Sequence, residues 1–126
     1  MAEGDPESRE PILGVAFYRT AAGNEPVRQW LKDLKREDRK AIGQDIKTAQ
    51  YGWPLGMPLI RKLEPGLWEV RSHIAQGIAR VIFTVADEVM VLLHVFIKKT
   101  QKTPLEDLRI ARQRLTDLRK EHSNEK

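Results

Sequence analysis

Basic side chains, one histidine and one aromatic ring recur at alternating positions late in the chain. The alternation falls in three segments with a strand-like period, at residues 67–72, 78–86 and 88–98. The turns between them are short enough only for antiparallel neighbours, so side chains of one parity meet on one face. On that face we expect Glu69, Arg71, Arg80, His94, Phe96 and Lys98, with Lys99 and Lys102 at its rim. Cations beside a histidine and a ring predict a pocket for a phosphate and a base.

The alternative interpretation is a half-solvated sheet face whose basic residues pair with stray carboxylates. Glu69 is the one acid on this face in the three segments. Most of the positive charge should therefore lack an internal partner. This excess favours anion binding over a purely structural face.

Several other chemistries have no support in the sequence. The chain has no cysteine, which excludes thiol nucleophiles and disulfides. His73, His94 and His122 do not have the spacing of a metal site, so we expect no metal and no cofactor. There is no glycine-rich phosphate loop and no Ser-His-Asp order.

Length and charge limit the kind of molecule that carries this face. The 126 residues fit a single small domain with a formal net charge of +4. The longest apolar run, at residues 89–97, is too short to cross a bilayer, and the acidic start lacks the features of a secretory signal. We therefore expect a cytoplasmic protein with no membrane partner.

The remaining elements should position the basic face. We expect a flexible arm over residues 1–14, one domain over residues 15–120 and a tail over residues 121–126. The domain should start with a strand at 15–20, followed by a helix from Pro26 and another at 37–50, which form a hairpin on one face of the sheet. A loop should follow, up to the strand that starts at Leu67. A capping box at Thr103 predicts a last helix that ends near Lys120. In the third late strand, Leu93 should share a face with Val95 and Ile97, and Leu92 should lie opposite.

Several segments of the domain resemble a known family. The segments are GNEPV (23–27), LWEVR (67–71), ARVIF (79–83) and HVFIKKTQKTP (94–104). In this order and spacing they resemble the RelE/HigB toxins of type II toxin–antitoxin systems, specifically their phage-derived branch. The resemblance covers residues 15–120 and implies an α+β fold, the microbial-ribonuclease-like antiparallel sheet with a helical hairpin on one face and a C-terminal helix.

The resemblance also implies a function. Such toxins are metal-independent endoribonucleases that cut mRNA, in many members on the ribosome, when the ribose 2′-OH attacks the adjacent phosphate to give a 2′,3′-cyclic phosphate. The catalytic candidates are Arg71, Arg80, His94, Lys98 and Lys99, and the RNA-binding candidates are Arg61, Lys62, Phe96 and Lys102. Arg80 matches the arginine that relatives place beside the scissile phosphate. The chain has no tyrosine after Tyr51, where relatives often have a catalytic one, so the general base stays open between His94 and a lysine of lowered pKa.

The family resemblance also predicts partners. They are a helix-turn-helix antitoxin, HigA-like, the mRNA on the ribosome, and operator DNA only through the antitoxin. Two alternatives stay open: a ParE-like inhibitor of DNA gyrase on the same fold, and a non-catalytic basic RNA-binding domain.

Overall fold

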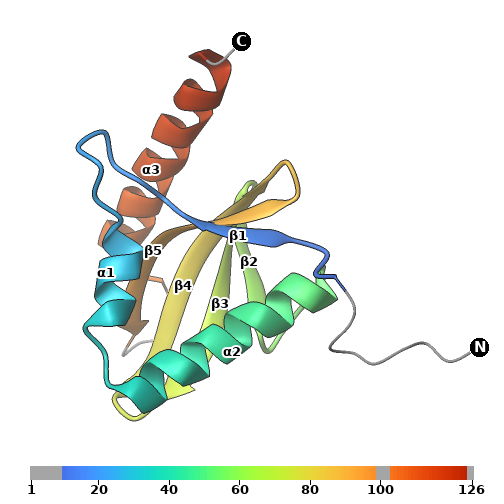
Figure 1. Ribbon diagram of the computed structural model, residues 1–126, viewed down its shortest axis with the longest axis vertical. Helices are drawn as coiled ribbons and strands as arrows, with labels where there is room; N and C mark the ends of the chain where they lie inside the picture. The colour runs from blue at the N-terminus through green and yellow to red at the C-terminus, as the bar shows by residue number, and fades with distance from the viewer. Residues whose placement is uncertain (1–9, 99–102, 125–126) are drawn as a thin grey trace, which may run out of the picture.

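A five-stranded sheet with helices on both faces forms the core of the computed structural model, which describes residues 10–98 and 103–124 (Figure 1). In the described ranges, one strand is followed by two helices, four strands and a last helix. They are β1 (Gly14–Phe17), α1 (Pro26–Lys32), α2 (Arg36–Gly52), β2 (Ile60–Glu64), β3 (Leu67–Ile74), β4 (Gly77–Ala86), β5 (Val89–Lys98) and α3 (Leu105–Asn124). The predicted α+β class is confirmed.

The sheet has the order β1-β5-β4-β3-β2 and is mixed. The neighbours β2–β3, β3–β4 and β4–β5 are antiparallel, as the short turns predict. β1 instead lies parallel to β5, so the prediction of a wholly antiparallel sheet is wrong for this pair. The reason is that α1, α2 and three strands separate β1 from β5 along the chain, and so long a connection does not fix the direction in which the strands pair.

Strand β2 lies where the sequence predicts a loop. Ile60 points into the core with only 2% of its surface exposed, and it pairs with Val70 of β3. The strand is short, carries three charged residues among five and follows a segment rich in proline and glycine, so its own pattern is weak. Pairing with β3 therefore stabilises this strand, which the local sequence pattern does not predict.

The ends of the domain also differ from the expected boundaries. The backbone N–H groups of Ile12 and Leu13 donate to the carbonyl oxygen of Gln50, and Leu13 is buried in the core. The fold therefore starts before residue 15, and α3 continues past Lys120 to Asn124. The rest of the predicted arm, residues 1–9, and the last two residues of the tail lie outside the described residues.

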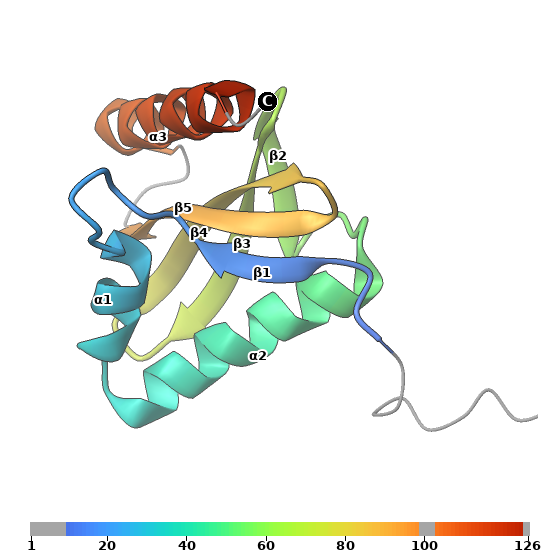
Figure 2. The ribbon, with the colours of Figure 1, turned by 45° about the horizontal axis from the view of Figure 1, so that its top comes forward.

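The pair α1–α2, the sheet and α3 form three layers, and a hydrophobic core lies between each layer and the next (Figure 2). The first core lies between the sheet and the pair α1–α2, as predicted for a hairpin on one face, and includes Val27, Ile42, Val70 and Phe83. The second core lies between the sheet and α3 and is formed by Tyr18, Leu67, Ile82, Val91, Leu93, Ala111 and Leu115. The face on which the sequence places the basic residues is thus partly covered by α3.

A β-bulge in β5 changes which side chains share a face. The register between β4 and β5 shifts between the pairs Ile82–His94 and Phe83–Leu92, so Leu93 is an extra residue on β5. Leu92 consequently lies in the first core and Leu93 in the second, which reverses their predicted faces. Beyond the bulge, Val95 lies in the first core and Phe96 packs against the second, as predicted.

Candidate functional site

The basic residues predicted from strand parity do share one face of the sheet. Arg71 of β3 lies opposite Arg80 of β4, which in turn lies opposite Phe96 of β5. One row further, Glu69 lies opposite Ile82, and Ile82 lies opposite His94. Directly opposed residues of neighbouring strands project to the same side, so these two rows lie side by side on the face that carries α3.

A buried ion pair is at the centre of this face. Nη1 of Arg80 donates to Oε2 of Glu69 over 2.5 Å, and the two residues are only 3% and 0% exposed. The hydroxyl of Thr103, just before α3, donates to the other carboxylate oxygen of Glu69. Arg80 Nε has no hydrogen-bond partner within the described part of the chain. Arg80 is therefore a fixed cation, and its partner is Glu69, the one acid that the sequence places on this face.

Lys98 of β5 is also buried, and the charges of Arg61, Arg71 and Arg80 act on it. Burial lowers the pKa of its ammonium group, and the positive charge of Arg80 lowers the pKa further. Arg61 and Arg71 act in the same direction, and Glu69 acts against them. We call Arg61, Arg71, Arg80 and Lys98 the cationic cluster. Within it, Lys98 gives up its proton more readily than an ordinary lysine.

His94 is held by Asp107, which is not among the residues that the sequence pattern predicts for the site. Its Nε2 lies 2.7 Å from Oδ1 of Asp107 in the first turn of α3, and its ring stacks on Phe96 with centroids 5.7 Å apart. Acidic residues are common in a first helical turn, so Asp107 looks in sequence like part of an ordinary helix start. Only the packing of α3 on β5 brings it to His94.

The two predicted RNA-binding residues of β2 lie on opposite faces of the sheet. Arg61 pairs with Glu69 and so lies on the face of the cationic cluster. Lys62 pairs with Trp68, and its Nζ lies 5.9 Å from the centre of that ring, on the face of α1 and α2. The structure thus does not bring these two residues together, because adjacent residues of a strand point in opposite directions. Contact of Lys62 with RNA stays a prediction. Lys99 and Lys102 lie outside the described residues.

Residues 10–98 and 103–124 contain no group of three or more metal-binding side chains. No helix in these ranges is both long and apolar enough to span a bilayer.

Comparison with known proteins gives one family match. The model of a family described as "Phage derived protein Gp49-like (DUF891)" matches residues 29–116, which extend from α1 into α3 and include the cationic cluster, His94 and Asp107. No match is found among curated proteins.

Proposed function

Because this chain belongs to the phage-derived Gp49-like family, a toxin-like family of toxin–antitoxin systems, we propose that it is a toxin that cuts mRNA as a metal-independent endoribonuclease. The observation that carries the proposal is the cationic cluster, in which a buried lysine of lowered pKa lies among three arginines. A surface that only binds phosphate needs cations but does not need one of them to lose its proton easily.

The cluster meets the electrostatic demand of phosphodiester cleavage. When the ribose 2′-OH attacks the neighbouring phosphate, negative charge builds on the phosphorane oxygens in the transition state. Arg71 and Arg80 lie side by side on neighbouring strands, and Glu69 holds Arg80 in one orientation. We assign both arginines to the stabilisation of that charge. Arg61 extends the positive surface onto β2, where it contacts the RNA backbone.

Two protons must move during the reaction. We assign Lys98 as the general base that takes the proton of the 2′-OH, because its lowered pKa increases the neutral fraction. We assign His94 as the acid that protonates the leaving 5′-oxygen, with Asp107 holding the imidazole in place. The products are then a 2′,3′-cyclic phosphate and a 5′-hydroxyl.

Phe96 lies between His94 and Lys98 on the same side of β5. Its ring offers a stacking surface for a base, which would place the adjacent phosphate near the cluster. Lys99 and Lys102 follow β5 in the sequence and remain predicted contacts, Lys99 at the cleaved phosphate and Lys102 on the RNA.

The family implies an antitoxin partner. We propose that this antitoxin is a HigA-like helix-turn-helix protein, that it contacts operator DNA on behalf of the pair, and that the mRNA substrate is bound to the ribosome in the cytoplasm.

Induced expression followed by primer extension on cellular mRNA tests the proposal. We expect growth to stop and new 5′ ends to appear, and the purified protein to release 2′,3′-cyclic phosphate ends from mRNA in the presence of ribosomes. Intact transcripts with inhibited gyrase supercoiling would support the ParE-like alternative instead. RNA binding without cleavage or toxicity would support the non-catalytic alternative.

A further inference from the structure

A second surface lies on the opposite side of the sheet from the cationic cluster. It is a groove of about 530 Å³ between β1, α1 and α2, with a floor formed by Phe17, Leu31, Ile46 and Leu92. Figure 2 shows α1 and α2 on one side of the sheet and α3 on the other. A ligand in this groove would therefore leave the cationic cluster uncovered.

One wall of the groove is an open sheet edge. β1 is an edge strand, and the N–H groups of Gly14 and Tyr18 donate to Glu88 and Leu92 on the side of β5. Because bonding alternates along a strand, the N–H and C=O groups of Val15 and Phe17 face the open side. Val15 is 43% exposed. Such an edge can accept a further strand from another chain.

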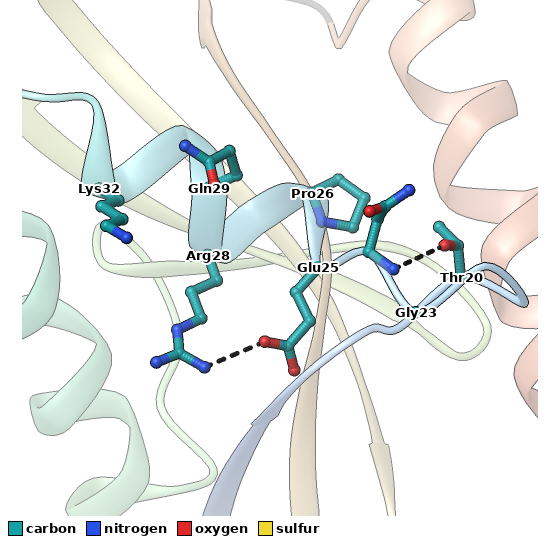
Figure 3. Close-up of a pocket in the computed structure, with 8 residues that line it drawn as sticks. Thr20, Gly23, Glu25, Pro26, Arg28, Gln29 and Lys32 are labelled. Atoms are coloured by element: carbon teal, nitrogen blue, oxygen red, sulfur yellow. Dashed lines mark hydrogen bonds and ion pairs between the residues drawn. The ribbon is translucent and has the colours of Figure 1, made fainter.

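The rim of the groove is basic. Arg28 and Lys32 of α1 and Arg39 of α2 line it, and no acidic residue does. An adjoining hollow shares Arg28 and Lys32, and there Glu25 pairs with Arg28 over 3.1 Å (Figure 3). Neither Lys32 nor Arg39 forms an ion pair with an acid in the described ranges, and the guanidinium of Arg39 donates to the backbone carbonyl of Lys32. Their charges are thus available to an acidic ligand.

We propose that this groove docks the antitoxin through an acidic segment with apolar side chains, which pairs as an extra strand with the open edge of β1. The apolar floor and the open backbone edge fit a polypeptide better than RNA, whose backbone offers no strand partner. The basic rim complements acidic side chains of the segment. This inference rests on the toxin–antitoxin part of the proposed function but not on ribonuclease activity.

Calorimetry with the full chain tests the electrostatic part. The probe is the protein encoded by the gene adjacent to that of this chain, purified with an affinity tag. We expect the double variant Lys32→Glu/Arg39→Glu to bind it about tenfold more weakly or worse, which corresponds to about 1.4 kcal/mol. The matched control Lys40→Glu/Lys47→Glu carries the same charge change on exposed positions of α2 outside the groove and should bind like the wild type.

Hydrogen exchange tests the strand pairing without a mutation. The amides of Val15 and Phe17 should exchange quickly in the free protein and become protected in the complex. Absence of binding to the wild-type chain, equal binding by both double variants, or unchanged exchange at these two amides would each overturn the inference. We call Lys32→Glu/Arg39→Glu the groove variant. If it loses ribosome binding while its affinity for the antitoxin is unchanged, the groove is an RNA surface and the inference is also overturned.

The ribonuclease proposal and the docking inference fail separately. Loss of antitoxin binding in the groove variant of a chain that cuts no RNA would refute the ribonuclease and keep the docking site. Normal cleavage with normal antitoxin binding by the groove variant would keep the ribonuclease and refute the docking site.

Discussion

The carboxylate of Glu69 and the guanidinium of Arg80 form a buried ion pair across β3 and β4, with 2.5 Å between oxygen and nitrogen. Both residues are almost fully enclosed. An arginine in this position cannot swing outward, so in the proposed reaction the RNA phosphate would approach a charge that is already fixed. Preorganised charge of this kind is effective because no reorganisation is needed as the transition state forms.

The ion pair predicts a specific pattern of stability. Replacing Arg80 by Met leaves the Glu69 carboxylate buried without its partner, so Arg80→Met should lower the free energy of unfolding by about 3–5 kcal/mol. The double variant Glu69→Met/Arg80→Met removes both charges and should be clearly more stable than Arg80→Met alone. Urea unfolding of the wild type, both single variants and the double variant measures the coupling. Additive losses would show that the two residues do not interact.

Cleavage should depend on Arg71 more than on other surface arginines. Arg71 is half buried beside Arg80, and the alanine variant removes one cation from the proposed site. We expect Arg71→Ala to lower the rate of mRNA cleavage by about 10²- to 10³-fold with an unchanged melting temperature. Arg109→Ala, which removes an exposed arginine of α3, is the control and should cleave normally. Equal rates for the two variants would remove Arg71 from the site.

The pH dependence of stability should reveal Lys98. Its pKa in the folded protein is lowered, chiefly by burial and then by Arg80, from an ordinary value of 10.5. Between the two values the unfolded chain binds more protons, so the free energy of unfolding should rise with pH across that window. The destabilisation is fully present below the folded-state pKa and is relieved as the pH rises toward 10.5.

Unfolding by urea at several pH values, compared between the wild type and Lys98→Met, isolates this contribution. The free energy of unfolding of the wild type should increase relative to that of Lys98→Met as the pH increases. Tyr18, whose pKa is raised by burial and by Asp117, is present in both proteins, so its titration cancels in the difference. A difference that does not vary with pH would contradict a lowered pKa at Lys98.

Asp107 should act on cleavage through His94. We expect His94→Gln to lower kcat by about 10²-fold or more, because the proposed proton donor is lost. Asp107→Asn should lower kcat by a smaller factor and leave KM unchanged, because it disturbs only the orientation of the imidazole. Glu106→Gln removes a charge from the same helical turn at an exposed position and serves as the control. Full activity of Asp107→Asn would leave the His94 contact without a role in catalysis.

Much of the fold follows from local patterns. Val27 and Leu31 at helical spacing, Pro26 at the first turn and the capping box at Thr103 indicate the helices, and alternation from Leu67 onward indicates β3, β4 and β5. The same alternation placed Arg71, Arg80, Phe96 and Lys98 on one face. These features depend on residues close together in sequence, where periodicity alone determines which side chains align.

What the sequence by itself determined is therefore the α+β class, the antiparallel run of β3 to β5 and the gathering of cations on one face. Only the tertiary structure decided that β1 is parallel to β5, that Ile60 starts a strand, that a bulge exchanges the faces of Leu92 and Leu93, and that Glu69 and Asp107 hold Arg80 and His94. Each of these depends on a partner that lies outside the local sequence window. Strand direction, bulges and ion pairs are chosen by the packing of the whole domain, because burial and pairing are properties of two surfaces together.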